Sequence, residues 1–345
     1  MAIKEERSNV KDILLLATGG TIASKHTEHG LAPQITSEEI IRYIPQVKDL
    51  CKVQTIQVCS IDSTNMEPGK WIQIVATIKE HYDEFDGFVI SHGTDTMAYT
   101  AAALSYLIQN SRKPIVITGS QKSIDVENTD GKSNLYDAFL YASADKSQGV
   151  VIVFDGKIIA GTRAKKVRSK SFNAFDSIDY PFLAMIQGDQ ILRYIPTIPY
   201  QDEVQFFEKI NGNICLMKLI PGITPFGLEE AFLHYDSIIV ESFGVGGIPS
   251  TISDEFYLLH QKYPDTLIVM ATQVSHEGSD MTVYEVGQKI KRDCDFLESY
   301  DMTLESVIAK TMWMLGNYTN REELEEAFYK QINFDLIFDK NRTSN

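Results

Sequence analysis

The sequence predicts an α/β protein with a large amino-terminal domain, built on a mostly parallel sheet flanked by helices, and a smaller carboxy-terminal α/β domain. Three observations predict it. Short apolar, β-branched runs alternate with segments whose apolar residues recur at helical spacing, a pattern typical of parallel sheets covered on both faces. The 345 residues exceed one ordinary core. A polar, proline-containing stretch at 194–212 interrupts the alternation. We therefore expect domains at 1–195 and 213–345, joined by a linker at 196–212.

In the amino-terminal domain, five apolar runs predict buried strands: Ile13–Ala17, Val53–Val58, Gly87–Ile90, Pro114–Thr118 and Val150–Phe154. Thr36 followed by Glu39 has the spacing of a capping box, which predicts the start of a helix. Two apolar stripes at helical spacing predict further helices, one of Trp71, Ile74, Val75 and Ile78, the other of Leu135, Ala138, Phe139 and Ala142.

The carboxy-terminal domain resumes the same alternation of strands and helices. Its expected strands are Ile214–Leu219, Ser237–Val240 and Leu267–Ala271. Its expected helices are Gly227–Phe232, Asp254–His260 and Leu304–Leu315. We expect this smaller domain to be flavodoxin-like.

Composition limits the partners and the location. The formal net charge is −15, which repels nucleic-acid phosphates and anionic lipid, so we expect no nucleic acid or membrane partner. Residues 1–12 lack the apolar core of a secretory signal, and no apolar run approaches the ~20 residues that span a bilayer. The four cysteines form no C-x-x-C pair. Reduced thiols and a cytoplasmic location are the simplest interpretation.

Two predicted strand ends carry hydroxyl side chains beside glycines. Thr18-Gly19-Gly20-Thr21-Ile22 follows the first strand, where paired glycines allow a sharp bend and close approach to a ligand. Ser91-His92-Gly93-Thr94-Asp95-Thr96 follows the third strand and leads into a helix near Met97. The threonines could cap that helix, and Asp95 would suit its positive end; Asp95 could equally hold a substrate ammonium group. Because ligands bind beyond the carboxyl ends of parallel strands, we expect a site there.

A third segment, Gly161-Thr162-Arg163-Ala164-Lys165-Lys166-Val167-Arg168, is strongly basic. Most of these side chains are accounted for as a solvated surface. A hydroxyl nucleophile nevertheless needs a base or a nearby cation at neutral pH, and a lysine screened from water could relay protons.

Together these motifs resemble the bacterial-type L-asparaginase family, most closely its cytoplasmic (type I) branch. The resemblance extends over nearly the whole chain and includes Ile61–Met66, Thr118–Gln121 and Ser242–Gly247. It implies an amidohydrolase that converts L-asparagine to L-aspartate and ammonia through an acyl-threonine intermediate, with minor glutaminase activity. It implies no metal or organic cofactor, and a homodimer or homotetramer.

Carried over residue by residue, the resemblance implies that Thr21 is the nucleophile. Thr94, Asp95 and the family lysine form a second catalytic group, and counting from Gly161 and Asn173 places that lysine at Lys166 rather than Lys165. The implied substrate contacts are Gly20, Asp62, Ser63, Thr64, Gly93 and Ser120. Among these, the Gly93 backbone and the Ser63 hydroxyl would hold the α-carboxylate, and Asp95 would bind the α-ammonium group.

This chain departs from the family pattern at three places. Leu31 occupies the position in the loop 28–33 where many relatives carry a tyrosine that assists the nucleophile, so a tyrosine from elsewhere, a water or Lys166 would activate Thr21. Gly30 and Pro33 suit a lid hinged at its ends, or an ordinary surface turn. Gly247 replaces an asparagine that relatives contribute across a subunit interface, a contact that could instead come from Glu285 or another residue. Glu241 and Ser242 replace the arginine of a regulatory asparagine site, and we expect no such regulation.

Two alternatives belong to other functions. One is the asparaginase-like subunit of a tRNA-dependent amidotransferase, which carries an extra amino-terminal module and whose complex handles tRNA; the acidic composition and the early first strand disfavour it. The other is a non-catalytic amino-acid-binding protein on the same fold, since fold alone does not establish activity. The joint presence of Thr21, Thr94, Asp95 and Lys166 favours an enzyme.

Overall fold

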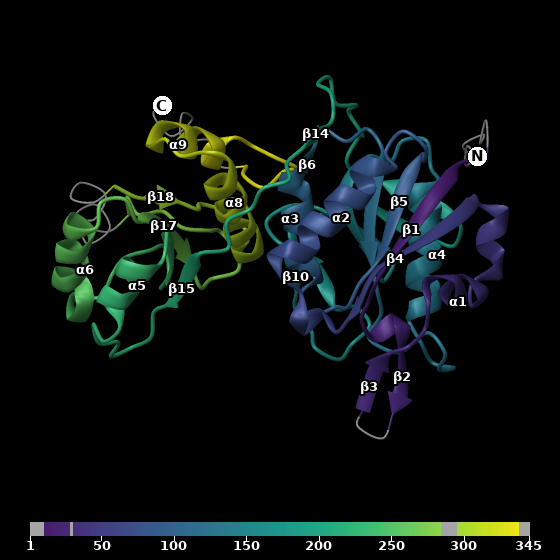
Figure 1. The fold of residues 1–345 in the computed structure, drawn as a ribbon, viewed down its shortest axis with the longest axis horizontal. Coiled ribbons are helices and arrows are strands. Elements are labelled where there is room, and N and C mark those ends of the chain that lie inside the picture. Colours follow the sequence, from purple (N-terminus) through teal and green to yellow (C-terminus); the bar gives the residue numbers. More distant parts are fainter. Residues whose placement is uncertain (1–9, 28–29, 284–294, 338–345) are drawn as a thin grey trace. The chain divides into compact units, whose positions relative to one another are not determined.

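The computed structural model describes residues 10–27, 30–283 and 295–337, which form two compact units, Met1–Glu208 and Lys209–Asn345 (Figure 1). Both units are α/β, and each contains a sheet with parallel strands. The predicted fold class, a large mostly parallel sheet with helices and a smaller α/β domain, is therefore confirmed. None of the helices in the described ranges has the length and apolarity that crossing a bilayer requires.

The sheet of the first unit has eight strands in the order β13-β12-β9-β8-β7-β5-β1-β4. Five of them are parallel and correspond to the five predicted runs: β1 (Asp12–Gly19), β4 (Lys52–Ile61), β5 (Gly87–Ser91), β7 (Pro114–Thr118) and β8 (Gly149–Phe154). The other three are antiparallel at one edge: β9 (Lys157–Ala160), β12 (Ala184–Gln187) and β13 (Gln190–Arg193).

The strand order reverses at β1. The chain passes from β1 to β4 on one side and then to β5 on the other. In open parallel sheets such a reversal separates the two connecting segments and opens a crevice at the carboxyl ends of the strands. The segments that follow β1 and β5, which carry the two predicted threonine motifs, therefore leave the sheet at this crevice.

Helices cover both faces of this sheet. Helices α1 (Ser37–Arg42) and α4 (Gly131–Ala142) lie on one face, and α2 (Pro68–Glu80) and α3 (Met97–Leu107) lie together on the other (Figure 1). The predicted stripe of α4 packs into a core with alternate residues of the parallel strands, as the two-residue period of a strand requires. The capping box of α1 is present, because Thr36 accepts a hydrogen bond from the Glu39 amide and the Glu39 side chain accepts one from the Thr36 amide.

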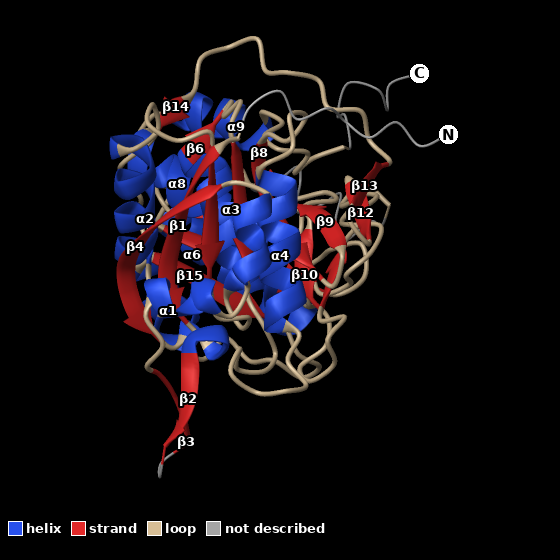
Figure 2. Cartoon of the chain, turned by 90° about the vertical axis from the view of Figure 1, so that its right-hand side faces the viewer, coloured by secondary structure: helices blue, strands red, loops and turns tan. Residues whose placement is uncertain are grey.

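Shorter elements complete the first unit. Strands β2 (Ser24–Thr27) and β3 (Gly30–Pro33) form an antiparallel hairpin that extends away from the rest of the unit (Figures 1 and 2). Two further antiparallel pairs are β10 (Ala164–Lys166) with β11 (Phe175–Ser177), and β6 (Ile108–Gln109) with β14 (Gln205–Phe206). Short 3₁₀ turns cover Thr21–Ala23, Pro45–Asp49 and Ser63–Asn65.

The second unit has a four-stranded parallel sheet in the order β15-β16-β17-β18. The strands are β15 (Ile214–Lys218), β16 (Ser237–Ser242), β17 (Leu267–Thr272) and β18 (Leu297–Glu298). The helices are α5 (Leu228–His234), α6 (Ser250–Lys262), α8 (Leu304–Asn317) and α9 (Arg321–Tyr329). All three predicted strands and all three predicted helices of this region are therefore present. Helices α5 and α6 enclose one apolar core with the sheet.

Candidate active site

The two threonine segments leave neighbouring strands and are joined where they begin. Strand β5 is buried along its whole length and ends at Ser91, and β1 lies beside it in parallel register. The Thr18 hydroxyl donates a hydrogen bond to the Ser91 carbonyl over 2.9 Å. This contact holds the two carboxyl ends together immediately before the residues that carry the chemistry.

Beyond the strand ends, the two segments are in backbone contact at Gly20 and Gly93. Gly20 has φ 78° and ψ −179°, a conformation that is essentially restricted to glycine. A Cβ atom at Gly20 would lie 2.3 Å from the Gly93 nitrogen, and one at Gly93 would lie 2.5 Å from the Ser63 Oγ. Each threonine directly follows one of these glycines, so Thr21, Thr94 and the Ser63 loop converge at one place.

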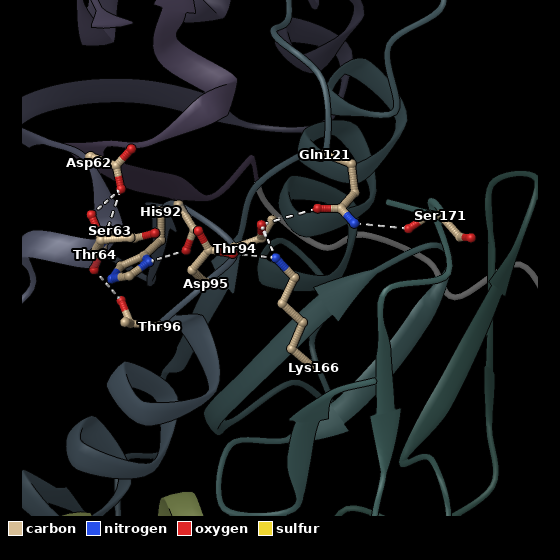
Figure 3. A network of polar contacts seen from close by, with 11 residues as sticks. Asp62, Ser63, Thr64, His92, Thr94, Asp95, Thr96, Gln121, Lys166 and Ser171 are labelled. Carbon is tan, nitrogen blue, oxygen red and sulfur yellow. Dashed lines mark hydrogen bonds and ion pairs between the residues drawn. The ribbon is translucent and has the colours of Figure 1, made fainter. Parts of the chain in front are cut away.

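Lys166 reaches the second threonine segment from β10. Its Nζ lies 2.8 Å from the Thr94 Oγ1 and 2.6 Å from the Asp95 Oδ1 (Figure 3). The Lys166 side chain is mostly buried, at 16% exposure, whereas the Asp95 side chain is 58% exposed. Lys165 precedes it in the same short strand, where successive side chains point to opposite faces. The structure therefore brings together Thr94, Asp95 and the lysine chosen from the sequence.

The alternative that the Thr94 or Thr96 side chain caps α3 is wrong. Thr96 occupies the position before the helix, but no side chain caps it. The Thr96 hydroxyl instead donates to the Ser63 carbonyl over 2.8 Å, which ties the α3 segment to the Ser63 loop. The Thr94 hydroxyl is engaged with other side chains, and the Asp95 carboxylate pairs with Lys166. The Thr94, Asp95 and Thr96 side chains thus contact other segments at the strand ends rather than the first turn of α3.

A buried histidine, which sequence reasoning did not single out, fixes the Gly93 peptide. The His92 Nδ1 lies 2.6 Å from the Gly93 carbonyl oxygen, and its Nε2 lies 2.9 Å from the Thr100 Oγ1, which also accepts the Trp71 indole N–H. A carbonyl can only accept, so Nδ1 carries the hydrogen and Nε2 accepts from Thr100. Burial lowers the pKa of His92 to about 4. The ring is therefore neutral near pH 7 with one defined tautomer.

The loop after β7 adds a residue that the sequence placed in a motif without a role. Gln121 Oε1 accepts a hydrogen bond from the Thr94 hydroxyl over 3.1 Å, and its Nε2 donates to the Ser171 carbonyl over 3.1 Å (Figure 3). The backbone amides of Gln121 and Lys122 donate to the Asp130 carboxylate. Burial raises the pKa of Asp130, and these amide hydrogen bonds oppose the rise. The sequence signals for Gln121 were its place at the end of the Thr118–Gln121 motif and its position shortly beyond a strand end.

The remaining expected substrate residues lie on the same crevice loops. The Asp62 Oδ1 accepts hydrogen bonds from the Thr64 amide and hydroxyl, each over 2.8 Å, which closes a tight turn around Ser63. Ser63 is buried at 4% exposure. Ser120 is fully buried, and its hydroxyl donates to the Lys122 carbonyl. One Asp62 oxygen and the Ser120 hydroxyl are thus already used in shaping their loops.

The departures from the family pattern lie in several places. Leu31 belongs to hairpin strand β3, where its backbone pairs with His26, and Gly30 and Pro33 are the two ends of that strand. Residues 28–29 of the expected lid, and Glu285, lie outside the described residues.

In the second unit, Glu241 accepts the Lys218 ammonium group over 3.0 Å. An open hollow of about 470 Å³ includes Gly247 and is bounded by the segments that follow β15 and β16: Ile220, Pro221, Gly222, Phe243, Gly246, Gly247, Ile248, Pro249 and Thr251.

Sequence families account for both units. Residues 12–197 match the family model for the asparaginase N-terminal domain, and residues 213–328 match that for the glutaminase/asparaginase C-terminal domain. The chain belongs to the asparaginase family. This asparaginase-family chain is 36% identical over 322 residues to an L-asparaginase of Thermococcus kodakarensis, which covers 93% of the chain and 97% of that relative. The family predicted from the sequence is thereby confirmed.

Solved structures agree with this assignment. The structure of the thermostable L-asparaginase from Thermococcus kodakarensis superposes with a TM-score of 0.88 at 34% identity, covering 95% of this chain and all of that one. L-asparaginase I of Vibrio cholerae gives a TM-score of 0.85 at 26% identity, covering 96% of this chain and all of that one, in keeping with the type I branch. A glutamyl-tRNA(Gln) amidotransferase subunit of Metallosphaera sedula is 30% identical, over 95% of this chain and 78% of that relative.

Proposed function

We propose that this protein is an L-asparaginase that hydrolyses L-asparagine to L-aspartate and ammonia by double displacement at Thr21. The observation that carries the proposal is the close backbone approach of Gly20 to Gly93, each of which directly precedes a threonine, together with the Lys166–Asp95 pair that contacts Thr94. A binding protein would need the carboxylate and ammonium contacts but neither hydroxyl. The match to the L-asparaginase of Thermococcus kodakarensis supports the same substrate.

The crevice can hold an amino acid by both ends. The amides of Gly93 and Thr94 form no hydrogen bond with the described residues, so they remain donors for an α-carboxylate beside the Ser63 hydroxyl. Asp95 uses one carboxylate oxygen for Lys166 and is more than half exposed, which leaves its other oxygen for the α-ammonium group. The side-chain amide would then lie between Thr21 and Ser120, with the 62–64 turn and Gly20 lining the crevice.

The reaction would proceed in two steps. The Thr21 oxygen attacks the amide carbon, and ammonia leaves with a proton supplied through Thr94 and Lys166. Water then hydrolyses the β-aspartyl ester and restores the Thr21 hydroxyl. Backbone amides would stabilise the oxyanion; losing one such donor costs roughly 2.7–4 kcal/mol in other enzymes. Within the described residues the Thr21 hydroxyl has no hydrogen-bond partner, so we propose a water as the group that accepts its proton.

Two related activities are separable by substrate. L-glutamine differs from L-asparagine by one methylene, and such differences give roughly 10- to 200-fold discrimination, so we expect minor glutaminase activity. The 30% identity to an amidotransferase subunit supports a second candidate, amide hydrolysis that supplies ammonia to a tRNA-dependent partner. That function would require the partner and its tRNA, whereas an asparaginase turns over the free amino acid unaided.

We also propose that the protein is a cytoplasmic homo-oligomer. The second unit exposes large apolar side chains: Phe226 is 97% exposed, and two residues that line its hollow, Ile220 and Phe243, are 56% and 41% exposed. Exposed apolar groups that gather in one region are typical of protein interfaces. A dimer or tetramer would cover them.

The function is tested by measuring ammonia release from L-asparagine and L-glutamine over a concentration series. The wild-type protein should hydrolyse asparagine in preference to glutamine, with hyperbolic kinetics because the regulatory arginine is replaced. Thr21→Ala and Thr94→Ala should each abolish ammonia release and leave the thermal midpoint nearly unchanged. Full activity in Thr21→Ala would refute its role as nucleophile, and a requirement for tRNA would favour the amidotransferase function.

A further inference from the structure

We propose that Gln121 is a positioning residue that sets the direction of the Thr94 hydroxyl and thereby the direction of proton delivery in the first step. The inference rests on the proposed function and adds a residue that the family resemblance does not assign. Gln121 lies between Thr94 and the carbonyl of Ser171, and the chain Ser171–Gln121–Thr94–Lys166–Asp95 forms one continuous line of polar contacts (Figure 3).

The orientation of the Gln121 amide is determined by its partners. The Ser171 carbonyl can only accept a hydrogen bond, so the group 3.1 Å from it must be the Gln121 NH₂. The Gln121 carbonyl oxygen must then face the Thr94 hydroxyl. No flip of the amide satisfies both neighbours, because it would place two acceptors against each other at Ser171.

This orientation in turn determines the Thr94 hydroxyl. The Thr94 oxygen has one hydrogen and two lone pairs. The Lys166 ammonium group donates to one lone pair over 2.8 Å, so the hydroxyl hydrogen cannot also point at Lys166. Gln121 Oε1 accepts that hydrogen instead, over 3.1 Å. Both hydrogen bonds of the Thr94 hydroxyl therefore run in one direction, from Lys166 through Thr94 to Gln121.

The same direction suits the departure of ammonia. As the C–N bond breaks, the Thr94 hydroxyl hydrogen transfers to the departing nitrogen while a Lys166 N–H hydrogen transfers to the Thr94 oxygen. One proton thus moves from Lys166 to ammonia, Thr94 is unchanged, and Lys166 is left as a neutral amine. The Thr21 hydroxyl proton passes to a water as the ester forms. When a second water hydrolyses the ester, one of its protons goes to the Thr21 oxygen, and the proton that the new aspartate carboxyl group releases restores the Lys166 ammonium group. Gln121 Oε1 holds the hydroxyl hydrogen until the nitrogen takes its place as acceptor.

Rigid anchors support the Gln121 side chain from both ends. Its backbone amide is held by both Asp130 oxygens, at 3.1 and 2.9 Å, and Asp130 is itself held by the Asn134 side chain. The far end of its side chain is held by Ser171 in the segment 167–174, which connects β10 and β11. An acceptor fixed in this way can orient a hydroxyl, whereas a freely rotating side chain could not.

Three variants separate this role from a general structural one. Gln121→Leu removes both side-chain hydrogen bonds. Gln121→Glu keeps an acceptor for Thr94, but restores the donor to Ser171 only when its carboxyl group is protonated. Lys122→Met is the matched control. The Lys122 ammonium group lies 5.4 Å from the centre of the Phe172 ring, in the same segment 167–174 that contains Ser171, but it makes no contact with Thr94.

For asparagine hydrolysis we expect Gln121→Leu to lower kcat about tenfold, as for loss of one oriented hydrogen bond to a reacting group, with KM changed less than twofold. Lys122→Met should keep wild-type kcat. The ratio of Gln121→Glu to wild-type kcat should rise as the pH falls from about 8 to about 5, towards the titration range of a carboxyl group, while the Gln121→Leu ratio stays flat. Wild-type kcat in Gln121→Leu, an equal loss in Lys122→Met, or a flat Gln121→Glu ratio would overturn the proposal.

A second readout does not depend on turnover. In protein labelled with ¹⁵N-lysine, the Nζ signal of Lys166, assigned by its loss in Lys166→Met, should move in Gln121→Leu and stay in place in Lys122→Met. An unchanged signal in Gln121→Leu would show that Gln121 does not act through Thr94. If the wild-type protein releases no ammonia from L-asparagine, the proposed function fails, and the Nζ signal alone decides the Gln121 proposal.

Discussion

Lys165 and Lys166 are adjacent in strand β10, within a segment that also carries Arg163 and Arg168. The pleat of a strand directs successive side chains to opposite faces, and the pairing of Lys166 with Phe175 in β11 sets which of the two reaches Thr94. At this scale the chemistry of a residue depends on register, which the residue type does not reveal. Composition does not distinguish the two lysines, and the choice of Lys166 came from its place in the motif of the related family.

We predict that Lys166→Met lowers kcat for L-asparagine at least about 100-fold, the lower range for loss of a proton-transfer group. Lys165→Met, which removes the same charge from the same strand, should retain kcat within about twofold of wild type, because the pleat directs the Lys165 side chain to the face of β10 opposite to Lys166. Steady-state kinetics of the two variants measure this. The reverse ranking would mean that Lys165 serves the site.

His92 leads to a prediction about acid stability. Its pKa is about 4 in the folded protein, because burial disfavours the charged ring, and about 6.5 in the unfolded chain. Between these values the unfolded state binds the extra proton, so the free energy of unfolding falls as the pH drops from about 6.5 to about 4, by at most about 3 kcal/mol.

Urea unfolding across this pH range measures the effect. His92→Asn, whose amide can still donate to the Gly93 carbonyl but does not titrate, should be less stable at pH 7 and should lose less stability on acidification. Parallel pH profiles for the two proteins would contradict the assigned burial of a neutral histidine.

At the scale of elements, the turn between β1 and the Thr21 segment depends on close backbone approach. Gly20→Ala would place a Cβ atom 2.3 Å from the Gly93 nitrogen in a conformation that side chains do not adopt, whereas Gly188→Ala would meet nothing within 4 Å at φ 60°. We predict that Gly188→Ala costs about 1–2 kcal/mol, the usual cost of a left-handed residue. Gly20→Ala should cost more and should abolish turnover.

Chemical denaturation and ammonia release on both variants check this prediction. Equal stability and full activity in Gly20→Ala would mean that the two threonine segments are not in contact.

Sequence patterns predicted the buried strands of the large sheet and the helices that pack against it. Strands β1, β5, β7 and β8 are continuous apolar runs, and the stripe of α4 has a clear helical period, because burial on both faces leaves a strong signal. The short strands β9, β12 and β13 contain only a few apolar residues beside polar ones, and their pairing depends on neighbours far along the chain. The alternative that Thr94 or Thr96 caps α3 fails because partners in distant loops, Gln121 and Ser63, accept their hydroxyl hydrogens.

The candidate site was predictable to a similar degree. Thr21, Thr94, Asp95 and Lys166 followed from strand-end position together with resemblance, and the structure places the last three in direct contact. Gln121 and His92 were not predicted as functional. Their importance comes from what they contact across the fold, and a glutamine or a histidine beside a strand end is as often an ordinary structural residue.

At the scale of the whole molecule, assembly and domain limits stay predictions. These predictions are the linker at 196–212 and the homo-oligomer. We predict that the purified protein elutes larger than its 38.9 kDa monomer in size-exclusion chromatography with light scattering. Phe226→Ser, which removes the most exposed large apolar side chain among those described, should shift the elution towards the monomer. An active monomeric wild type would contradict the proposal.

The central claim is that Thr21 forms a covalent ester while Thr94 helps to complete the reaction. It is tested most directly by mixing Thr94→Val protein with L-asparagine, quenching in acid and measuring peptide masses. The account predicts a peptide that contains Thr21 and is heavier by one aspartyl group, absent when Thr21→Ala is combined with Thr94→Val. An aspartyl group on another residue, or wild-type turnover in a protein that lacks the Thr21 hydroxyl, would contradict it.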